Sequence, residues 1–277
     1  MKFNYNTLNV TLNPKSRSIE VLLNRPEHNH AINVEMLFEL ESLFAWLTSH
    51  IEVNAITISS TDNNQNIFSS GFDQNELSIM STEKVQKYMV RFQKIITGML
   101  HLPQTIICDL RDGAHGMAIE LALGADIRVA SKSSTMQFNS LENGWVSCAG
   151  GTGLLSHLVG HGFARQWTLS SKTIGQEQMI SSGLVLETYG EGENPSAHIL
   201  DKILKQAPVA RIQTKGAFLE EVRPSVEQAW NFESAFAFAA LKTGDWKSDS
   251  EEEFASARDF GSNIKKNHPT PTPDLQA

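Results

Sequence analysis

A single carboxylate inside an apolar helical run is the feature that most constrains this chain. Residues 116–125 have the sequence GMAIELALGA, and Glu120 is the one charged residue among them. An ionised carboxylate buried in such surroundings costs several kcal/mol unless it is paired or neutralised. Glu120 is therefore either a first-turn residue favoured by the helix dipole and held by a core hydrogen bond, or a proton-transfer group with a shifted pKa. From this segment alone both interpretations stay open.

The same segment resembles the signature region of the crotonase superfamily, which contains the enoyl-CoA hydratases and isomerases. The family pattern is a Gly-rich turn, then Glu-Leu-Ala, then an Asp six residues after the Glu. Here Gly116, the residues 120–122 and Asp126 match it. Later in the pattern a Gly is followed six to eight residues on by Gly-Gly-Thr, and Gly144 and residues 150–152 match that spacing.

Three further blocks agree with the family in the same order along the chain. They are FSSGFD at residues 68–73, LNRP at residues 23–26 with Ala31, and GLV at residues 183–185. Each block alone is a weak match, but four blocks in register cover most of residues 1–190. The resemblance implies an α/β fold, with a crotonase-like spiral of ββα turns over residues 1–195. It also implies a C-terminal helical trimerisation region over residues 196–277.

Composition limits the partners and the compartment. The 277 residues suit one large domain, or one domain with a helical appendage, and 40% hydrophobic residues are enough for a core. A net charge of −8 without a long basic run argues against nucleic acid as a partner. Two cysteines, Cys108 and Cys148, imply no disulfide framework, and no Cys/His cluster has metal-ligand spacing. Without a signal peptide or membrane span in the sequence, we expect a cytoplasmic protein with no membrane partner, metal or cofactor.

Periodicity and turn signals predict strands alternating with helices, which favours buried parallel strands. The predicted strands are residues 6–12, 18–23, 55–59, 105–110, 127–130 and 135–138. The predicted helices are residues 34–49, 82–100, 151–159, 163–170 and 175–180, with further helix from about residue 197. Residues 187–195 predict a loop, and residues 269–277 predict disorder. The apolar segment 229–241 predicts a helix buried on more than one face, in the core or at a subunit interface.

The resemblance implies chemistry through a thioester enolate, whose oxygen needs two preorganised N–H donors. The matching positions are the backbone N–H groups of Phe72 and Met117. Relatives usually have small residues at both positions, so Phe72 is expected to narrow the pocket, and a positive φ at Met117 would add strain. Without the family, Phe72 is interpreted as a core aromatic and Met117 as a gap-filling thioether. The predicted substrate-binding residues flank this pair and are Ser70, Gly71, Asp73 and Gly116.

Glu120 matches the first catalytic Glu of the hydratases, and the second falls at Ser140. A serine cannot act as a carboxylate base at neutral pH, so the resemblance does not extend to a two-carboxylate hydration. Glu142 lies about 6–7 Å farther along an extended chain and is interpreted by default as a surface residue. Cys148 lies where some relatives carry a functional residue and is interpreted first as lining the pocket. Glu142, Cys148 and Ser140 remain second candidates for catalysis.

Two basic positions of the family are missing. Relatives often carry a cation after Arg-Pro and another three residues after the first N–H donor, where this chain has Glu27 and Asn75. CoA is polyanionic, so the loss of two cations is expected to lower its affinity. The candidates for compensation are Arg25, Lys84, Lys87, Lys242 and Lys247.

Together these patterns predict an enoyl-CoA hydratase/isomerase-like enzyme that acts on an acyl-CoA thioester, with CoA as part of the substrate. Glu120 is the expected acid/base, and isomerisation is favoured over hydration because one base can remove a proton and return it. The alternative is a non-catalytic acyl-thioester-binding protein on a degenerate crotonase scaffold. The apolar segment 229–241 and the resemblance also predict a homotrimer or a hexamer.

Overall fold

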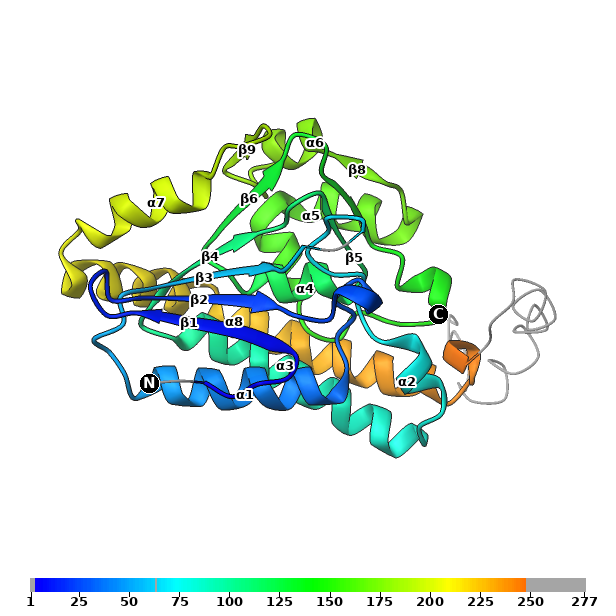
Figure 1. Ribbon diagram of the computed structural model, residues 1–277. Coiled ribbons are helices and arrows are strands. Elements are labelled where there is room, and N and C mark those ends of the chain that lie inside the picture. Colours follow the sequence, from blue (N-terminus) through cyan, green and yellow to red (C-terminus); the bar gives the residue numbers. More distant parts are fainter. Residues whose placement is uncertain (1–2, 63, 248–277) are drawn as a thin grey trace, which may run out of the picture.

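A six-stranded sheet lies at the centre of the computed structural model, which describes residues 3–62 and 64–247 (Figure 1). Its strand order is β1-β2-β3-β4-β6-β9, and the pairing is parallel except between β1 and β2. The strands are β1 (Leu8–Asn13), β2 (Ser18–Leu23), β3 (Ala55–Ser60), β4 (Thr105–Asp109), β6 (Ile127–Ser131) and β9 (Glu187–Tyr189). A smaller sheet contains β5 (Gly113–His115), β7 (Thr135–Gln137) and β8 (Ile174–Gly175).

The chain repeats one path through the two sheets. β4 leads into β5 and then into α4 (Met117–Leu123), and β6 leads into β7 and then towards α5 (Gly153–Ser170). β3 is followed by a bridge between Ser69 and Ala114, which joins that segment to β5 before α2 (Gln74–Ser78) and α3 (Thr82–His101). This repeated ββα path confirms the predicted crotonase-like α/β fold.

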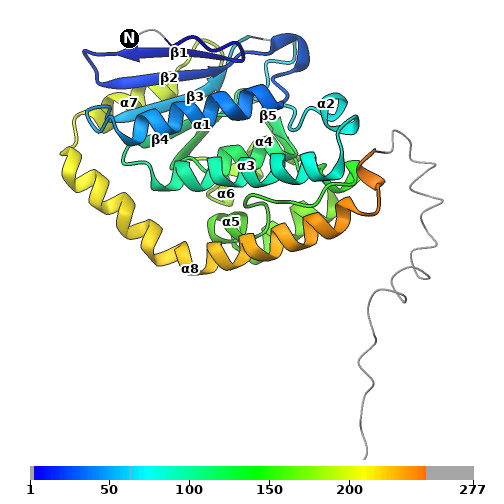
Figure 2. The same cartoon turned by 90° about the horizontal axis from the view of Figure 1, so that it is seen from below.

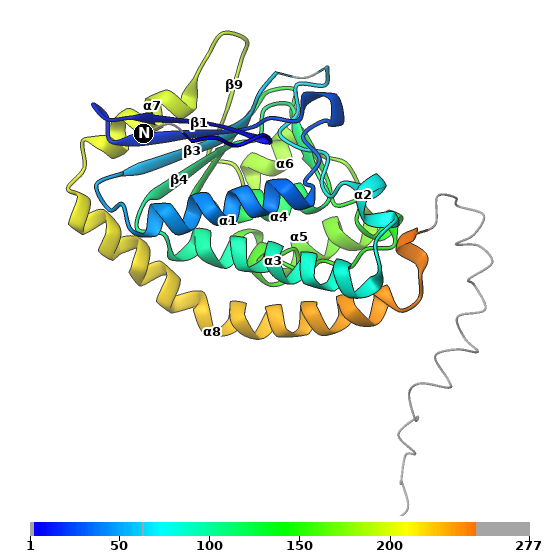
Figure 3. The same ribbon diagram turned by 60° about the horizontal axis from the view of Figure 1, so that its bottom comes forward.

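Helices cover both faces of the parallel strands. On one face α1 (Val34–Thr48), α3 and the C-terminal half of α8 (Pro208–Leu241) lie side by side (Figures 2 and 3). On the other face, α7 (Pro195–Leu204) packs Ile199 and Ile203 against β3, β4 and β6; the strand residues in this contact are Ala55, Ile107 and Val129. These strands are buried on both sides, which explains their nearly continuous apolar sequences.

Two further helical features lie in the second half of the chain. α6 (Gln176–Ser181) follows β8. α8 bends between its yellow and orange parts in Figure 2, and the helix contains Pro224. Proline lacks the N–H of the helical ladder and clashes with the preceding turn, which accounts for a bend there. Within residues 3–62 and 64–247, none of the helices combines the length and hydropathy that crossing a bilayer requires.

Two predicted elements differ from the structure, and a third is described by a single label. The predicted loop at residues 187–195 begins with β9, because these residues pair with the edge of β6. The two helices predicted at residues 151–159 and 163–170 are confirmed as the two parts of α5, which non-helical dihedral angles at Gly160 (φ 80°, ψ 154°) separate. The segment 229–241 was expected to be buried on more than one face, but within this chain Phe232 and Phe236 are 57% and 67% exposed. The disorder predicted for residues 269–277 lies outside the described residues.

The contact between α5 and α8 at Gly153 generates a test of the packing. A Cβ atom at Gly153 would lie 2.3 Å from the Cβ of Ala229, which is closer than two carbon atoms can approach. Gly153→Ala should therefore lower the free energy of unfolding by about 1–3 kcal/mol. Ala229→Gly removes the clashing atom but costs about 1 kcal/mol of helix propensity. Urea unfolding should show that the double variant loses less than the sum of the single variants, whereas additive losses would contradict this contact.

Candidate active site

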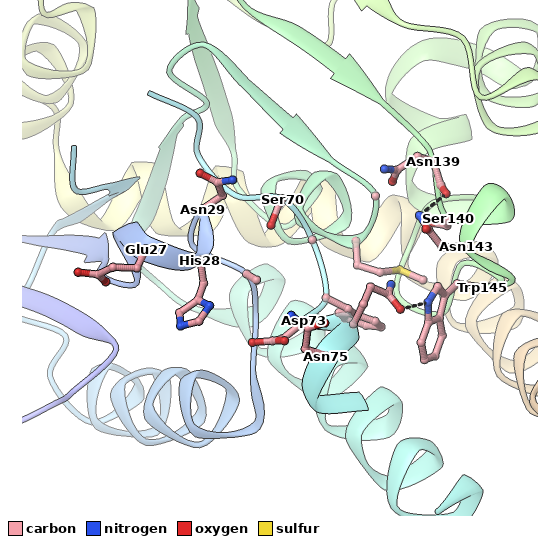
Figure 4. A pocket seen from close by; sticks show the side chains of 16 residues that line it. Glu27, His28, Asn29, Ser70, Asp73, Asn75, Asn139, Ser140, Asn143 and Trp145 are labelled. Carbon is pink, nitrogen blue, oxygen red and sulfur yellow. Dashed lines mark hydrogen bonds between the residues drawn. The ribbon is translucent and has the colours of Figure 1, made fainter. Parts of the chain in front are cut away.

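A pocket of about 420 Å³ lies between the segments 27–31, 70–75 and 139–145 and the turn before α4 (Figure 4). Most of the predicted site residues line it. These are Ser70, Gly71, Phe72, Asp73, Gly116, Met117 and Ser140. The structure thus gathers residues from three separate sequence blocks around one cavity, while Glu120, Glu142 and Cys148 are not among the lining residues.

Two free backbone N–H groups border this pocket. Those of Phe72 and Met117 donate to no acceptor among the described residues. The two peptides are brought together by Gly71, where a Cβ atom would lie 3.4 Å from the Met117 nitrogen and 2.9 Å from the His115 carbonyl oxygen. The positive φ angles fall on the glycines that precede each donor, Gly71 at 99° and Gly116 at 51°. Glycine adopts these angles without strain, so neither bulky residue carries the strain considered for Met117.

Phe72 belongs to an aromatic cluster that closes one side of the pocket. Its ring meets those of Tyr88, Phe92 and Trp145 edge-on, with centroid distances of 4.8, 5.1 and 5.8 Å. The Trp145 indole Nε1–H donates to Gln74 Oε1 at 2.8 Å (Figure 4). Phe72 is thus both a core aromatic and a wall of the pocket, so the two interpretations made from the sequence coexist.

Glu120 is buried outside the lining of the pocket and is 1% exposed. Its Oε1 accepts a hydrogen bond from Ser147 Oγ at 2.9 Å. Its Oε2 accepts from the backbone N–H groups of Cys148 and Ala149 at 3.3 and 2.6 Å. Burial, and secondarily the negative charge of Glu233, raise the pKa of Glu120 to about 8. At neutral pH the carboxyl group is mainly protonated, and its O–H can donate to Ser147 Oγ while Oε2 keeps both N–H donors.

A second buried carboxylate, Glu233 of α8, was not singled out from the sequence. It accepts hydrogen bonds from the backbone N–H groups of Gly150, Thr152 and Gly153 at 2.8, 2.8 and 3.1 Å, and from the Thr152 hydroxyl. Glu233 therefore caps the start of α5, beside the three residues that bind Glu120. The signal that could have found it is the one that drew attention to Glu120, a lone carboxylate within an apolar helical run.

The second candidates for catalysis lie in different environments. The Ser140 hydroxyl lines the pocket and has no hydrogen-bond partner in the described part of the chain. Glu142 is exposed and accepts a long hydrogen bond, 3.4 Å, from Gln137 Nε2. Cys148 is buried, and desolvation raises the pKa of its thiol well above the usual value. A protonated thiol in this position is a poor nucleophile.

The pocket is acidic and polar. Among the described residues that line it there is no lysine or arginine, while Glu27 and Asp73 are present. Arg25 is committed to Asp73, with 2.8 Å between Nη1 and Oδ2. Lys87 pairs with Glu83, and the other lysines considered for compensation lie outside the lining. In residues 3–62 and 64–247, no group of three or more His, Cys, Asp or Glu side chains is arranged to hold a metal ion.

Several lining residues were not anticipated from the sequence. They are Asn29, Gln74, Asn139, Asn143 and Trp145. Gln74 is the first residue of α2, and the other four lie in turns, in irregular structure or in a short 3₁₀ segment. In such places neither helical nor strand periodicity indicates which way a side chain points. The Asn143 amide donates to the Asn139 carbonyl oxygen at 2.9 Å and so holds this wall of the pocket in one conformation (Figure 4).

Comparisons with known proteins agree with the fold. The model of the enoyl-CoA hydratase/isomerase family matches residues 15–262. The chain is 28% identical over 241 residues to a short-chain-enoyl-CoA hydratase of Clostridium acetobutylicum, covering 86% of this chain and 92% of that protein. It is 24% identical over 257 residues to a peroxisomal Delta(3,5)-Delta(2,4)-dienoyl-CoA isomerase of Arabidopsis thaliana, covering 87% and 91%. The crystal structure of an enoyl-CoA hydratase/isomerase from Mycobacterium paratuberculosis superposes with a TM-score of 0.80 at 19% identity, covering 88% and 98%.

The raised pKa of Glu120 makes stability depend on pH in a defined direction. Between the unfolded value of 4.5 and the folded value of about 8, the folded chain binds one more proton than the unfolded chain. This contribution to stability is therefore complete below pH 4.5 and is lost as the pH rises towards 8. Glu120→Gln removes the titration but keeps the contacts, because the amide oxygen can accept both N–H groups while its NH₂ donates to Ser147 Oγ.

Urea unfolding between pH 5 and 9 should show this difference. We expect the wild-type unfolding free energy to fall relative to that of Glu120→Gln by on the order of several kcal/mol across this range. The comparison cancels the titrating groups that do not interact with Glu120, because these are common to both proteins. Parallel pH profiles would contradict a raised pKa at Glu120.

Proposed function

Because this chain belongs to the enoyl-CoA hydratase/isomerase family, we propose that it binds an acyl thioester in the pocket and stabilises its enolate. The observation that carries the proposal is the pair of unpaired N–H groups of Phe72 and Met117 beside the cavity. A thioester oxygen between them receives two hydrogen bonds, which strengthen as negative charge develops. Gly71 and Gly116 supply the backbone turns, and the adjoining Ser70 and Asp73 complete the proposed binding residues.

Glu120 is the proposed acid/base. It lies three residues after Met117, on the same face of α4 and one turn along. A pKa of about 8 gives both protonation states near neutral pH, which suits a group that removes a proton and returns it. Ser140 occupies the position of a second carboxylate, so no second side chain is available there to activate water. We therefore favour isomerisation of an acyl-CoA thioester over hydration, with CoA as part of the substrate.

One observation favours a second candidate function, thioester binding without turnover. Glu120 is outside the lining of the pocket, and both of its carboxyl oxygens are engaged by the segment 147–149. A carboxyl group fixed in this way serves the fold even if it never meets a substrate. The two candidates differ in whether a bound thioester exchanges its α-protons.

Deuterium uptake at the α-carbon of a bound thioester separates the two. With acetoacetyl-CoA and other enolisable thioesters, wild-type protein should catalyse exchange, and Glu120→Gln should lower its rate by roughly 10²–10⁴-fold while thioester binding persists. Glu177→Gln is the matched control, since it makes the same chemical change at an exposed position on α6, outside the pocket.

Three results are informative. Exchange that survives in a folded Glu120→Gln variant would remove Glu120 from the mechanism. Wild-type protein that binds thioesters, as a rise in melting temperature, but exchanges no proton would establish the non-catalytic candidate. A wild-type protein that neither binds nor exchanges any thioester would overturn the proposed function itself.

We further propose that the C-terminal helical region assembles the chain into a homotrimer or a hexamer. Phe232 and Phe236 lie one turn apart on α8 and are 57% and 67% exposed in the single chain. Large apolar side chains exposed next to one another are characteristic of interaction surfaces.

The two free cysteines, Cys108 and Cys148, suit a reducing compartment, and we propose the cytoplasm.

Light scattering at micromolar concentration should give three or six times the chain mass of 30.7 kDa. Replacing both Phe232 and Phe236 by serine should lower the mass while leaving the circular dichroism spectrum unchanged, because both side chains are exposed within the chain. A wild-type monomer at this concentration would refute the proposed assembly.

A further inference from the structure

We infer that the pocket selects a short, uncharged acyl group that carries a hydrogen-bonding end, in preference to an alkyl chain. This inference rests on the proposed function, because it names the substrate class of the same pocket. It follows from three features of the lining: an interlocked aromatic wall, a pair of unpaired polar side chains, and the absence of a cation among the described lining residues.

The aromatic cluster leaves no channel for an alkyl chain on its side of the pocket. Phe72, Tyr88, Phe92 and Trp145 are each at most 5% exposed. Trp145 is held from two directions, by its hydrogen bond to Gln74 and by the ring of Trp246 at a centroid distance of 5.3 Å. A side chain with contacts on several sides cannot change its rotamer without losing those contacts. A long acyl group therefore cannot push Trp145 away to make room for itself.

Two polar side chains, those of Asn139 and Ser140, border the proposed N–H pair. The Asn139 amide and the Ser140 hydroxyl line the pocket and have no hydrogen-bond partner within the described part of the chain. A Cβ atom at Gly116 would lie 2.8 Å from Asn139 Oδ1 and 3.6 Å from Ser140 Oγ. Both groups therefore lie next to the peptide whose N–H would hold the thioester oxygen, within reach of an atom a few bonds along the acyl chain.

Ser140 is 9% exposed, and its hydroxyl group opens onto the pocket. A ligand that displaces water from such polar groups loses affinity unless it replaces the hydrogen bonds of that water. An amide or hydroxyl end supplies both a donor for Asn139 Oδ1 and an acceptor for the Ser140 O–H. A methyl end supplies neither and would leave both side chains unpaired.

The charges of the lining residues indicate whether the hydrogen-bonding end of the acyl group is neutral or anionic. Glu27 and Asp73 line the pocket without a lysine or arginine among the described lining residues. The one guanidinium that reaches Asp73 belongs to Arg25 and is already paired with it. Because this pair neutralises Asp73, a carboxylated acyl group would meet the negative charge of Glu27 without a free counter-charge, which favours a neutral hydrogen-bonding end.

Four CoA thioesters test the inference by isothermal titration calorimetry. Succinamoyl-CoA has the neutral amide end, succinyl-CoA replaces the amide by a carboxylate, pentanoyl-CoA has an apolar end of similar length, and octanoyl-CoA has a long chain. We expect succinamoyl-CoA to bind wild-type protein about tenfold more tightly than each of the other three.

Two variants test whether Asn139 and Ser140 create the preference for succinamoyl-CoA. Ser140→Ala and Asn139→Ala should each bring the affinities for succinamoyl-CoA and pentanoyl-CoA close to one another. Ser181→Ala makes the same serine change at an exposed position on α6, outside the pocket, and should keep the wild-type ratio. Thermal melts of each variant report whether it is folded.

The outcomes separate this inference from the proposed function. Equal or tighter binding of pentanoyl-CoA, octanoyl-CoA or succinyl-CoA would overturn the inferred substrate class while leaving the thioester site intact. A preference that persists in both Ser140→Ala and Asn139→Ala would show that another part of the pocket creates it, and would also overturn the inference. Failure of all four thioesters to bind at millimolar concentration would overturn the proposed function together with the inference.

Discussion

The structure around the pocket depends on two buried carboxyl groups that hold one stretch of backbone. Glu120 of α4 binds the N–H groups of Cys148 and Ala149, and Glu233 of α8 binds those of Gly150, Thr152 and Gly153. Five of six consecutive peptide N–H groups thereby find acceptors without belonging to a strand or to the interior of a helix. Buried N–H groups without acceptors are costly, so the segment between the pocket wall and α5 can be buried only because both carboxyl groups are present.

This arrangement ties the C-terminal helices to the centre of the fold. Glu233 belongs to the C-terminal helices, which look like a separate appendage in the sequence. Its carboxylate nevertheless accepts hydrogen bonds from the same backbone segment as Glu120. Gly151 is required between them, because a Cβ atom there would lie 2.3 Å from Ser147 Oγ and 3.2 Å from Glu120 Oε1. The environment of Glu120 is therefore set jointly by α4, by the 147–153 segment and by α8.

The sequence predicts the fold well where a local pattern carries the information. β1 and α1 follow from alternation, from apolar periodicity and from the Asn33 cap, whose side chain accepts the Met36 N–H. β9 could not be found in this way, since only its pairing with β6 makes residues 187–189 a strand. The residues of the pocket divide in the same way into those that the sequence predicts and those that it does not. Phe72 and Met117 follow from family spacing, whereas Asn139 and Trp145 lie in irregular segments, and Glu120 lies outside the lining for reasons of packing between distant elements.

The departures from the family pattern form one physically consistent set. A carboxylate at position 140 would place a negative charge in the pocket and would add like-charge repulsion to Glu120. Here burial, and secondarily the negative charge of Glu233, already raise the pKa of Glu120 while position 140 stays neutral. A neutral Ser140 beside Asn139 gives a wall that forms hydrogen bonds without selecting for charge. In the proposed function, the replacement of the carboxylate, the aromatic wall at Phe72 and the missing cations would together change what the pocket binds, while the pair of N–H donors remains in place.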